Sequence, residues 1–207
     1  MDVKHHLGAV ERSVSSRDSD GQPARAVILS RSFPTSARDL WDAVTNRERI
    51  PRWFLPISGE LEPGGRYQFE GNAGGVITAC EPQSHLALTW EFGGDVSRVE
   101  VRVREDGADQ ARLTLTHTQR PSEHWVRYGP GATGVGWELG LMGLAMYLAQ
   151  PGGPMPDEAF FATPEGRALI TGSSESWGEA AISDGADPRD ARAAADRTTA
   201  FYTGEVA

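Results

Sequence analysis

The chain has 207 residues, of which 39% are hydrophobic and 24% are charged, as in ordinary globular proteins that bury a core. Its 20 basic and 29 acidic residues give a formal net charge of −9 without a basic stripe, which excludes nucleic acid as the default partner. We predict a cytoplasmic protein, because Cys80 is the single cysteine and no export signal is found near the start. We also predict no membrane span, because the longest apolar run covers only residues 139–149.

The first part of the chain predicts two strands and two helices. In chain order they are a first hairpin strand around residues 9–14, a strand over 25–33, a helix that begins at Thr35 or Ser36, and a short helix over 46–54. Pro34 ends the second strand because proline cannot donate to a strand ladder. A hydroxyl side chain then caps the first helix, whose apolar face contains Leu40, Trp41 and Val44.

The middle of the chain is rich in strand patterns. Five runs separated by turn residues cover residues 66–71, 75–81, 86–92, 97–105 and 111–119. This regular spacing is typical of an antiparallel meander. In the last three runs apolar and polar residues alternate, so one face of the sheet is predicted to be apolar and the other to be polar and exposed to solvent. The apolar face is predicted to contain Leu86, Leu88, Trp90, Phe92, Val99, Val101, Val103, Leu113, Leu115 and His117.

A long helix is predicted over residues 133–150. Its apolar stripe, expected to cover the apolar face of the sheet, consists of Trp137, Leu141, Leu144 and Leu148. Glu138 is the one charged residue of this helix, so the remaining surface also predicts burial. A second stripe consists of Gly136, Gly140 and Gly143. Because a glycine inside a helix costs about 0.8–1 kcal/mol relative to alanine, this stripe implies close packing or empty space.

Two further helices are predicted after a linker rich in proline and glycine. One begins at Thr163 and Pro164 and the other at Asp187 and Pro188, where a capping side chain precedes proline. We expect both to dock on the exposed back of the 133–150 helix, because amphipathic helices are unstable alone. The predicted organisation is a polar segment with a first hairpin strand over 1–23, a domain over 24–150 and a packed helical extension over 151–207.

The order of hairpin strand, short helices, meander and long helix is that of the helix-grip fold. In this α+β fold a curved antiparallel sheet wraps around a long C-terminal helix. Its elements carry the motifs Arg31-Ser32-Phe33-Pro34, Leu40 to Asn46, Trp53-Phe54, Gly64-Gly65, Thr89-Trp90-Glu91 and Gly136-Trp137. Together these motifs resemble the activator-of-heat-shock-protein-90-ATPase homologue-like family of the START-like (SRPBCC) superfamily, over residues 24–149.

The resemblance implies a cavity between the sheet and the long helix, which in relatives holds lipids, polyketides or other apolar molecules. We therefore expect a START-like domain that binds a small hydrophobic ligand, such as a lipid or a polyketide-like molecule. The candidate cavity residues are Trp53, Phe54, Tyr67, Phe69, Leu88, Trp90, Val101, Leu115, His117, Trp137, Leu141 and Leu144. Since fold does not determine function, a cyclase- or hydrolase-type enzyme and a co-chaperone-like interaction module remain alternatives.

Three polar residues lie among these apolar positions. His117 either orients the polar end of a ligand, acts as a general base, or bonds to the backbone at a strand end. Arg31 either meets a ligand carboxylate or pairs with an acid such as Asp42 or Glu60. Glu138 is expected to pair with a nearby arginine. Because no catalytic constellation, metal-ligand spacing or cofactor motif is present, we predict no catalytic residue, no metal and no cofactor.

The predicted partner is therefore a small apolar molecule. A homodimer, formed through the extension helices or the apolar back of the long helix, is left open. Residues 1–23 contain nothing like the Asn- and Trp-containing chaperone-stimulating motif of the eukaryotic co-chaperones. For this reason we do not predict a chaperone partner.

Overall fold

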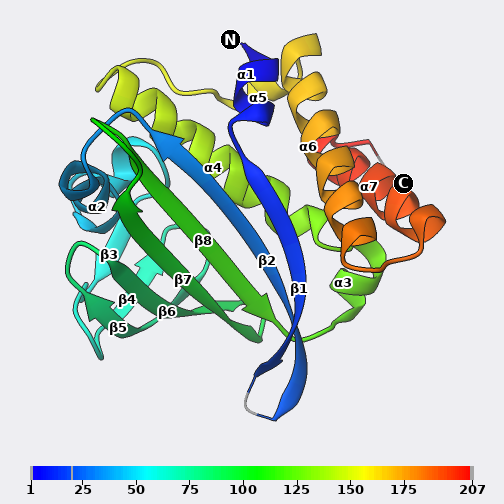
Figure 1. Cartoon of the computed structure of the whole chain (residues 1–207), viewed down its shortest axis with the longest axis horizontal. Helices are drawn as coiled ribbons and strands as arrows, with labels where there is room; N and C mark the ends of the chain where they lie inside the picture. The colour runs from blue at the N-terminus through cyan, green and yellow to red at the C-terminus, as the bar shows by residue number, and fades with distance from the viewer. Residues whose placement is uncertain (1, 20, 206–207) are drawn as a thin grey trace. The chain divides into compact units, whose positions relative to one another are not determined.

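The computed structural model describes residues 2–19 and 21–205. Residues 1 and 20 of the predicted N-terminal segment, and residues 206 and 207 of the predicted extension, lie outside the described residues. Within the described residues, eight strands form one sheet in the order β1-β2-β8-β7-β6-β5-β4-β3 (Figure 1). The order of the elements confirms the predicted α+β class and the antiparallel meander.

The bounds of the elements agree well with the strong sequence patterns. The strands are β1 Glu11–Ser19, β2 Gln22–Phe33, β3 Ile57–Gly59, β4 Arg66–Phe69, β5 Gly74–Glu81, β6 His85–Phe92, β7 Asp95–Glu105 and β8 Ala111–Gln119. The helices are α1 Val3–Gly8, α2 Ala37–Thr45, the 3₁₀ turn η1 Ile50–Arg52, α3 Glu123–Tyr128, α4 Gly131–Ala149, α5 Glu158–Phe161, α6 Pro164–Ser183 and α7 Pro188–Thr203.

The chain divides into two compact units, each built from separate stretches of sequence. The first unit consists of Met1–Leu29, Arg120–Met142 and Pro156–Ala207. The second unit consists of Ser30–Gln119 and Gly143–Met155. Strand β2 and helix α4 each contribute residues to both units. The sequence predicted a different kind of division, into consecutive segments with boundaries after residues 23 and 150. That division stays a prediction.

The meander of the second unit has the predicted alternation of faces. Strands β4 to β8 pair antiparallel with their neighbours, and the register sets Leu88 opposite Val99 and Val99 opposite His117. Burial in β8 alternates residue by residue, with His117 on the buried side. Phe92 keeps the register of β6, but it ends the strand beside a Gly-Gly turn and its surface is 58% exposed.

The predicted short helix over residues 46–54 is wrong in extent, since only the three-residue turn η1 forms there. Asn46 ends α2, and its side-chain Oδ1 accepts a hydrogen bond from the Glu48 N–H at 2.9 Å. This local bond competes with continuation of the helix. The short helices α1, α3 and α5, of six residues or fewer, were not predicted because they contain too few residues to show a periodic pattern.

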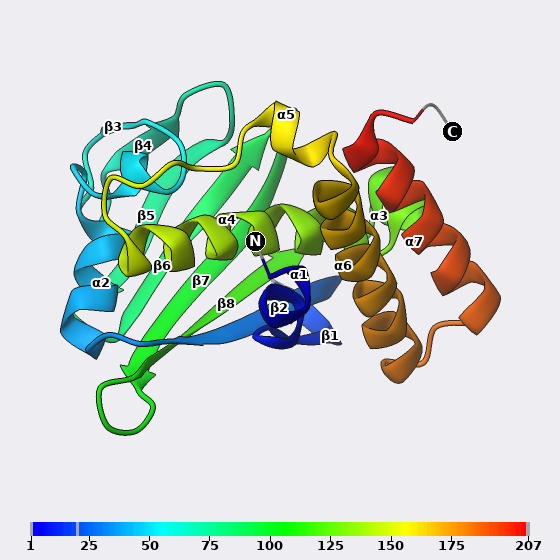
Figure 2. The same cartoon turned by 90° about the horizontal axis from the view of Figure 1, so that it is seen from above.

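Helices α6 and α7 of the first unit begin where the capping motifs predict. Thr163 caps α6 and Asp187 caps α7, each followed by proline in the first turn. The two helices lie side by side in both views (Figure 1, Figure 2). Small residues allow this approach, since a Cβ atom at Gly178 of α6 would lie 3.3 Å from the Cβ atom of Ala195 of α7.

These two helices pack closely on the N-terminal part of α4 through glycines. A Cβ atom at Gly134 would overlap the indole of Trp177, which is fully buried. A Cβ atom at Gly131 would lie 2.7 Å from the Thr198 hydroxyl. The Tyr202 hydroxyl also donates to the Ala132 carbonyl at 2.6 Å. The glycines therefore allow α6 and α7 to cover the back of this part of α4.

A buried ion pair joins β1 to α4 within the first unit. Arg12 Nε donates to Glu138 Oε1 at 2.6 Å, and its Nη2 donates to Oε2 at 2.8 Å. The two side chains are only 10% and 7% exposed. The same guanidinium donates to the carbonyls of Leu7 and Val10, so it also holds the end of α1. This contact confirms the expected arginine partner of Glu138.

Replacing Gly134 by alanine is expected to destabilise the protein. The added methyl overlaps the Trp177 ring, so we expect Gly134→Ala to lower the free energy of unfolding by about 2 kcal/mol in urea denaturation. Gly8→Ala is the control, because nothing lies within 4 Å of its Cβ, and it should change stability by less than about 0.5 kcal/mol. Equal stability of both variants would contradict the close packing.

Removing one partner of the Arg12–Glu138 pair is expected to cost more than removing both. Arg12→Met leaves the Glu138 carboxylate buried and unpaired, so we expect a loss of about 3 kcal/mol or more. The double variant Arg12→Met/Glu138→Leu should be more stable than Arg12→Met alone. As the control, Arg192→Met breaks an exposed pair with Glu179 at 3.9 Å and should cost less than about 0.5 kcal/mol. Additive losses in the double variant would argue against this account.

Candidate functional site

Six ring side chains of the second unit form one continuous chain of contacts. The centroid distances are 5.6 Å for Trp53–Phe54, 5.1 Å for Phe54–Phe69, 5.5 Å for Tyr67–Phe69, 5.8 Å for Phe69–Trp90 and 6.2 Å for Trp90–His117. Most of these contacts are edge-to-face or tilted, as is favourable for aromatic pairs. The sequence predicted all six residues as candidate cavity residues. We call these six side chains the aromatic chain.

Local structure explains how these rings come together. Tyr67 and Phe69 lie two residues apart on β4 and therefore share a face. Trp53 and Phe54 follow η1, where the Trp53 indole N–H donates to the Ala43 carbonyl at 2.9 Å. The Tyr67 hydroxyl donates to the Thr89 carbonyl at 2.6 Å. Because backbone groups satisfy these polar atoms, the rings present apolar surface.

His117 ends the aromatic chain and forms a hydrogen bond with Ser97. The Nε2 atom of His117 lies 2.7 Å from the Ser97 hydroxyl, which donates its own proton to the Trp90 carbonyl at 3.1 Å. This hydrogen bond joins the imidazole to the serine hydroxyl, and which of the two groups donates depends on the tautomer of His117.

Burial keeps this imidazole neutral. His117 is 6% exposed, and removal from water lowers its pKa from the ordinary value of 6.5 to about 4. A general base works best when its pKa is near the working pH. His117 is therefore a weak base at neutral pH, and its neutral ring is suited to hold a polar atom by a hydrogen bond.

Sequence reasoning missed Ser97, although a signal for it was present. Ser97 shares the parity of Val99, Val101 and Val103 on β7, so its hydroxyl lies on the otherwise apolar face. The register places it opposite Trp90 and diagonally from His117. The pattern that would have indicated Ser97 is a small polar residue at a position where the alternation predicts an apolar one, next to a strand with a buried histidine.

Part of the apolar face beside the aromatic chain remains accessible. Leu88, Trp90 and Val101 are half-buried, whereas Val99 and Leu115 on the same face are buried. The register makes these residues neighbours, since Leu88 is opposite Val99 and Val101 is opposite Leu115. The predicted cavity residues of these strands therefore form one continuous apolar surface.

The C-terminal part of α4 belongs to this unit and carries the predicted residue Leu144, which is fully buried. A Cβ atom at Gly143 would lie 2.5 Å from the Trp53 carbonyl, so the helix backbone passes close to the aromatic chain. Arg49 Nε also donates to the Tyr147 hydroxyl at 3.1 Å. These contacts fix the end of α4 within the second unit.

Two predicted cavity residues, Trp137 and Leu141, lie in the part of α4 that belongs to the first unit. The other ten belong to the second unit, and their grouping as one cavity stays a prediction. Arg31 is also buried there, and its guanidinium lies 5.5 Å from the centroid of the Phe33 ring. Asp42 pairs with Arg49 at 2.8 Å, and a pairing of Arg31 with an acid stays a prediction.

Two features of the described residues bear on partners. In the part of the chain that the structure describes, no group of three or more His, Cys, Asp or Glu side chains is arranged to hold a metal ion. Across residues 2–19 and 21–205, none of the helices combines the length and the apolar character that crossing a membrane requires.

Comparisons with known proteins identify relatives of the chain. The profile of the family described as "Activator of Hsp90 ATPase homolog 1-like protein" matches residues 34–149. The solution NMR structure of CalU16 from Micromonospora echinospora is 34% identical, and the match covers 85% of this chain and 97% of that chain with a TM-score of 0.73. The CalU16 crystal structure is 31% identical, with coverages of 84% and 99% and a TM-score of 0.69. These likenesses confirm the predicted family and the helix-grip fold.

Two further relatives match shorter stretches. DynU16, a protein in the dynemicin biosynthetic locus, is 25% identical with a TM-score of 0.54, and the match covers 64% of this chain and 50% of DynU16. The activator of 90 kDa heat shock protein ATPase homolog 1 of Mus musculus is 29% identical over 72 residues, or 34% of this chain. The chain spans only 21% of the length of that mouse relative.

The lowered pKa of His117 predicts a pH dependence of stability. The unfolded chain binds a proton at this side chain near pH 6.5, whereas the folded chain does so only near pH 4. The stability contributed by neutral His117 is therefore present above pH 6.5 and is lost as the pH falls toward 4, by up to roughly 3 kcal/mol.

Urea denaturation at about pH 7 and at about pH 4.5 tests this dependence. His117→Gln keeps an N–H donor but does not titrate, so its free energy of unfolding should fall less between the two pH values than that of the unaltered chain. His124→Gln, on the exposed helix α3, is the control for removing a histidine. An equal fall in all three proteins would disprove the role of His117.

Proposed function

Because the chain belongs to the Activator of Hsp90 ATPase homolog 1-like family, we propose that it binds a small hydrophobic ligand, lipid-like or polyketide-like, on the surface formed by the aromatic chain. The fold and family support a ligand-binding or polyketide cyclase-like domain. The ligand would lie between the apolar face of strands β6 to β8 and the C-terminal part of α4. Ten of the twelve predicted cavity residues contribute to this proposed site.

The observation that carries the proposal is the accessible apolar surface beside the aromatic chain. Leu88, Trp90 and Val101 retain partial exposure on the sheet face that also carries the buried Leu115. Covering apolar surface contributes about 25 cal/mol per Å², so a ligand that covers these side chains gains binding energy. Small-molecule sites are typically apolar surfaces with few polar groups, and His117 would be such a group here.

The chemistry of His117 supports binding over catalysis. With a pKa of about 4, the imidazole would be a poor proton acceptor for a cyclase or hydrolase reaction at neutral pH. A neutral imidazole, positioned by its hydrogen bond with Ser97, instead suits recognition of a polar atom of the ligand. We therefore favour a binding protein over an enzyme that uses the same surface.

The relatives support a small molecule more than a chaperone. DynU16 belongs to a biosynthetic locus, which favours a ligand of the natural-product kind. The mouse activator is matched over only a fifth of its length, so the likeness gives little support for a co-chaperone role. A cytoplasmic location remains part of the proposal, as does the absence of a chaperone partner.

Ligand binding can be tested by titration with fatty acids and aromatic polyketides while tryptophan fluorescence is measured. We expect at least one ligand class to bind with a change in fluorescence, because Trp53 and Trp90 lie in the aromatic chain. Val101→Phe fills part of the accessible surface and should weaken that binding by about tenfold or more. Native mass spectrometry of gently purified protein would show whether a ligand is retained.

Arg102→Ala is the matched control for this experiment. Arg102 is the neighbour of Val101 on β7, points to the opposite face and is exposed. Its replacement should leave the affinity unchanged. If no ligand class binds, or if Val101→Phe and Arg102→Ala bind equally well, the proposed site is wrong.

A further inference from the structure

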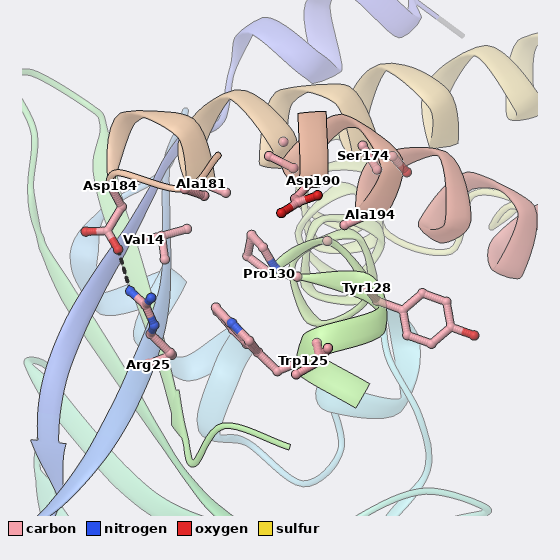
Figure 3. A pocket seen from close by; sticks show the side chains of 17 residues that line it. Val14, Arg25, Trp125, Tyr128, Pro130, Ser174, Ala181, Asp184, Asp190 and Ala194 are labelled. Carbon is pink, nitrogen blue, oxygen red and sulfur yellow. Dashed lines mark hydrogen bonds and ion pairs between the residues drawn. The ribbon is translucent and has the colours of Figure 1, made fainter. Parts of the chain in front are cut away.

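The first unit contains a pocket of about 200 Å³, distinct in composition from the aromatic chain (Figure 3). Residues of β1, β2, α3, α6, α7 and the start of α4 line it. Much of the wall is glycine and alanine, including Gly131, Gly178, Ala191 and Ala194. These small side chains leave the space that larger residues would fill. An apolar cavity of about 150 Å³ can hold benzene, so this pocket has room for one ring with a short side arm.

The charged groups at the pocket are unbalanced. Arg25 Nη1 pairs with Asp184 Oδ2 at 2.8 Å and also donates to the Ser16 hydroxyl at 2.9 Å. Among the described residues that line the pocket, Asp190 is the carboxylate for which no ion pair is found. Figure 3 shows Asp190 of α7 and the Trp125 indole of α3 on two sides of the pocket, and Asp190 is exposed. The opposite charges of Arg25 and Asp184 cancel, so the negative charge of Asp190 remains.

The start of α7 does not favour an anionic ligand. Helix N-termini attract anions through unsatisfied backbone N–H groups. Here Asp187 Oδ1 accepts from the N–H groups of Arg189 and Asp190 at 2.9 and 3.1 Å. The chain also carries a net charge of −9. The helix terminus is thus occupied by its own side chain, and the field at the pocket favours a cation.

We propose that this pocket binds a small arylalkylammonium ion, whose ammonium group pairs with Asp190 and whose ring packs against Trp125. The carboxylate supplies a charge-assisted hydrogen bond. The indole and the alanine-rich wall supply apolar contact for the ring, and the indole face also attracts a cation. The volume limits the ligand to a single ring with a short arm. This site goes beyond the proposed function, because it lies wholly within the first unit.

The test compares two probes that differ in charge, 2-phenylethylammonium and 2-phenylethanol, on the full chain. Calorimetric titration should show that the ammonium ion binds at least about tenfold more tightly than the alcohol. In NMR spectra of the indole N–H groups, the ammonium ion should shift the signal of Trp125 among the six tryptophans of the chain. This comparison does not depend on any variant being folded.

Two variants then locate the charge. Asp190→Asn should weaken binding of the ammonium ion by at least about tenfold, because it removes the unpaired carboxylate. Asp196→Asn removes an exposed carboxylate of the same helix outside the pocket and should leave affinity unchanged. The proposal is overturned by no binding of the ammonium ion, equal affinity for both probes, no effect of Asp190→Asn, or a shift confined to Trp53 or Trp90.

Discussion

The packing of the Trp177 indole on Gly134 is the constraint on which the first unit depends. A helix that is apolar on nearly every side has to be covered, and each of its glycines weakens it by about 1 kcal/mol. That cost is offset only where a large side chain reaches the helix backbone, as Trp177 does. The same rule explains why the N-terminal part of α4, α6 and α7 meet through glycine, alanine and threonine. The small residues that permit this approach also leave the pocket beside Asp190 open.

The second unit depends on a different rule, the alternation of side chains along paired strands. Alternation places Trp90, Ser97 and His117 on one face, and the register makes them neighbours. Burial of the histidine follows from that placement, and burial in turn keeps the imidazole neutral. The neutral state of His117 is thus a consequence of strand register. Backbone carbonyls satisfy the polar atoms of Trp53 and Tyr67, which leaves their rings free for apolar contact.

Local signals predicted most of the elements. The caps at Thr163 and Asp187, and the strand alternation up to His117, are readable because each depends on residues close in sequence. Pairings between distant residues were not readable to the same degree. The sequence predicted an arginine partner for Glu138, but it could not identify Arg12, which lies 126 residues away. It likewise predicted the six rings of the site but not the Ser97 hydroxyl that forms a hydrogen bond with His117.

The two proposed sites differ in how they treat charge, and this difference follows from desolvation. At the aromatic chain burial holds both titratable groups, His117 and Tyr67, neutral, so a charged ligand atom there would lose its water without gaining an opposite charge. At the pocket of the first unit, the exposed Asp190 carboxylate would instead supply an opposite charge to an ammonium ion. Charge rather than shape would therefore distinguish the ligand classes of the two proposed sites.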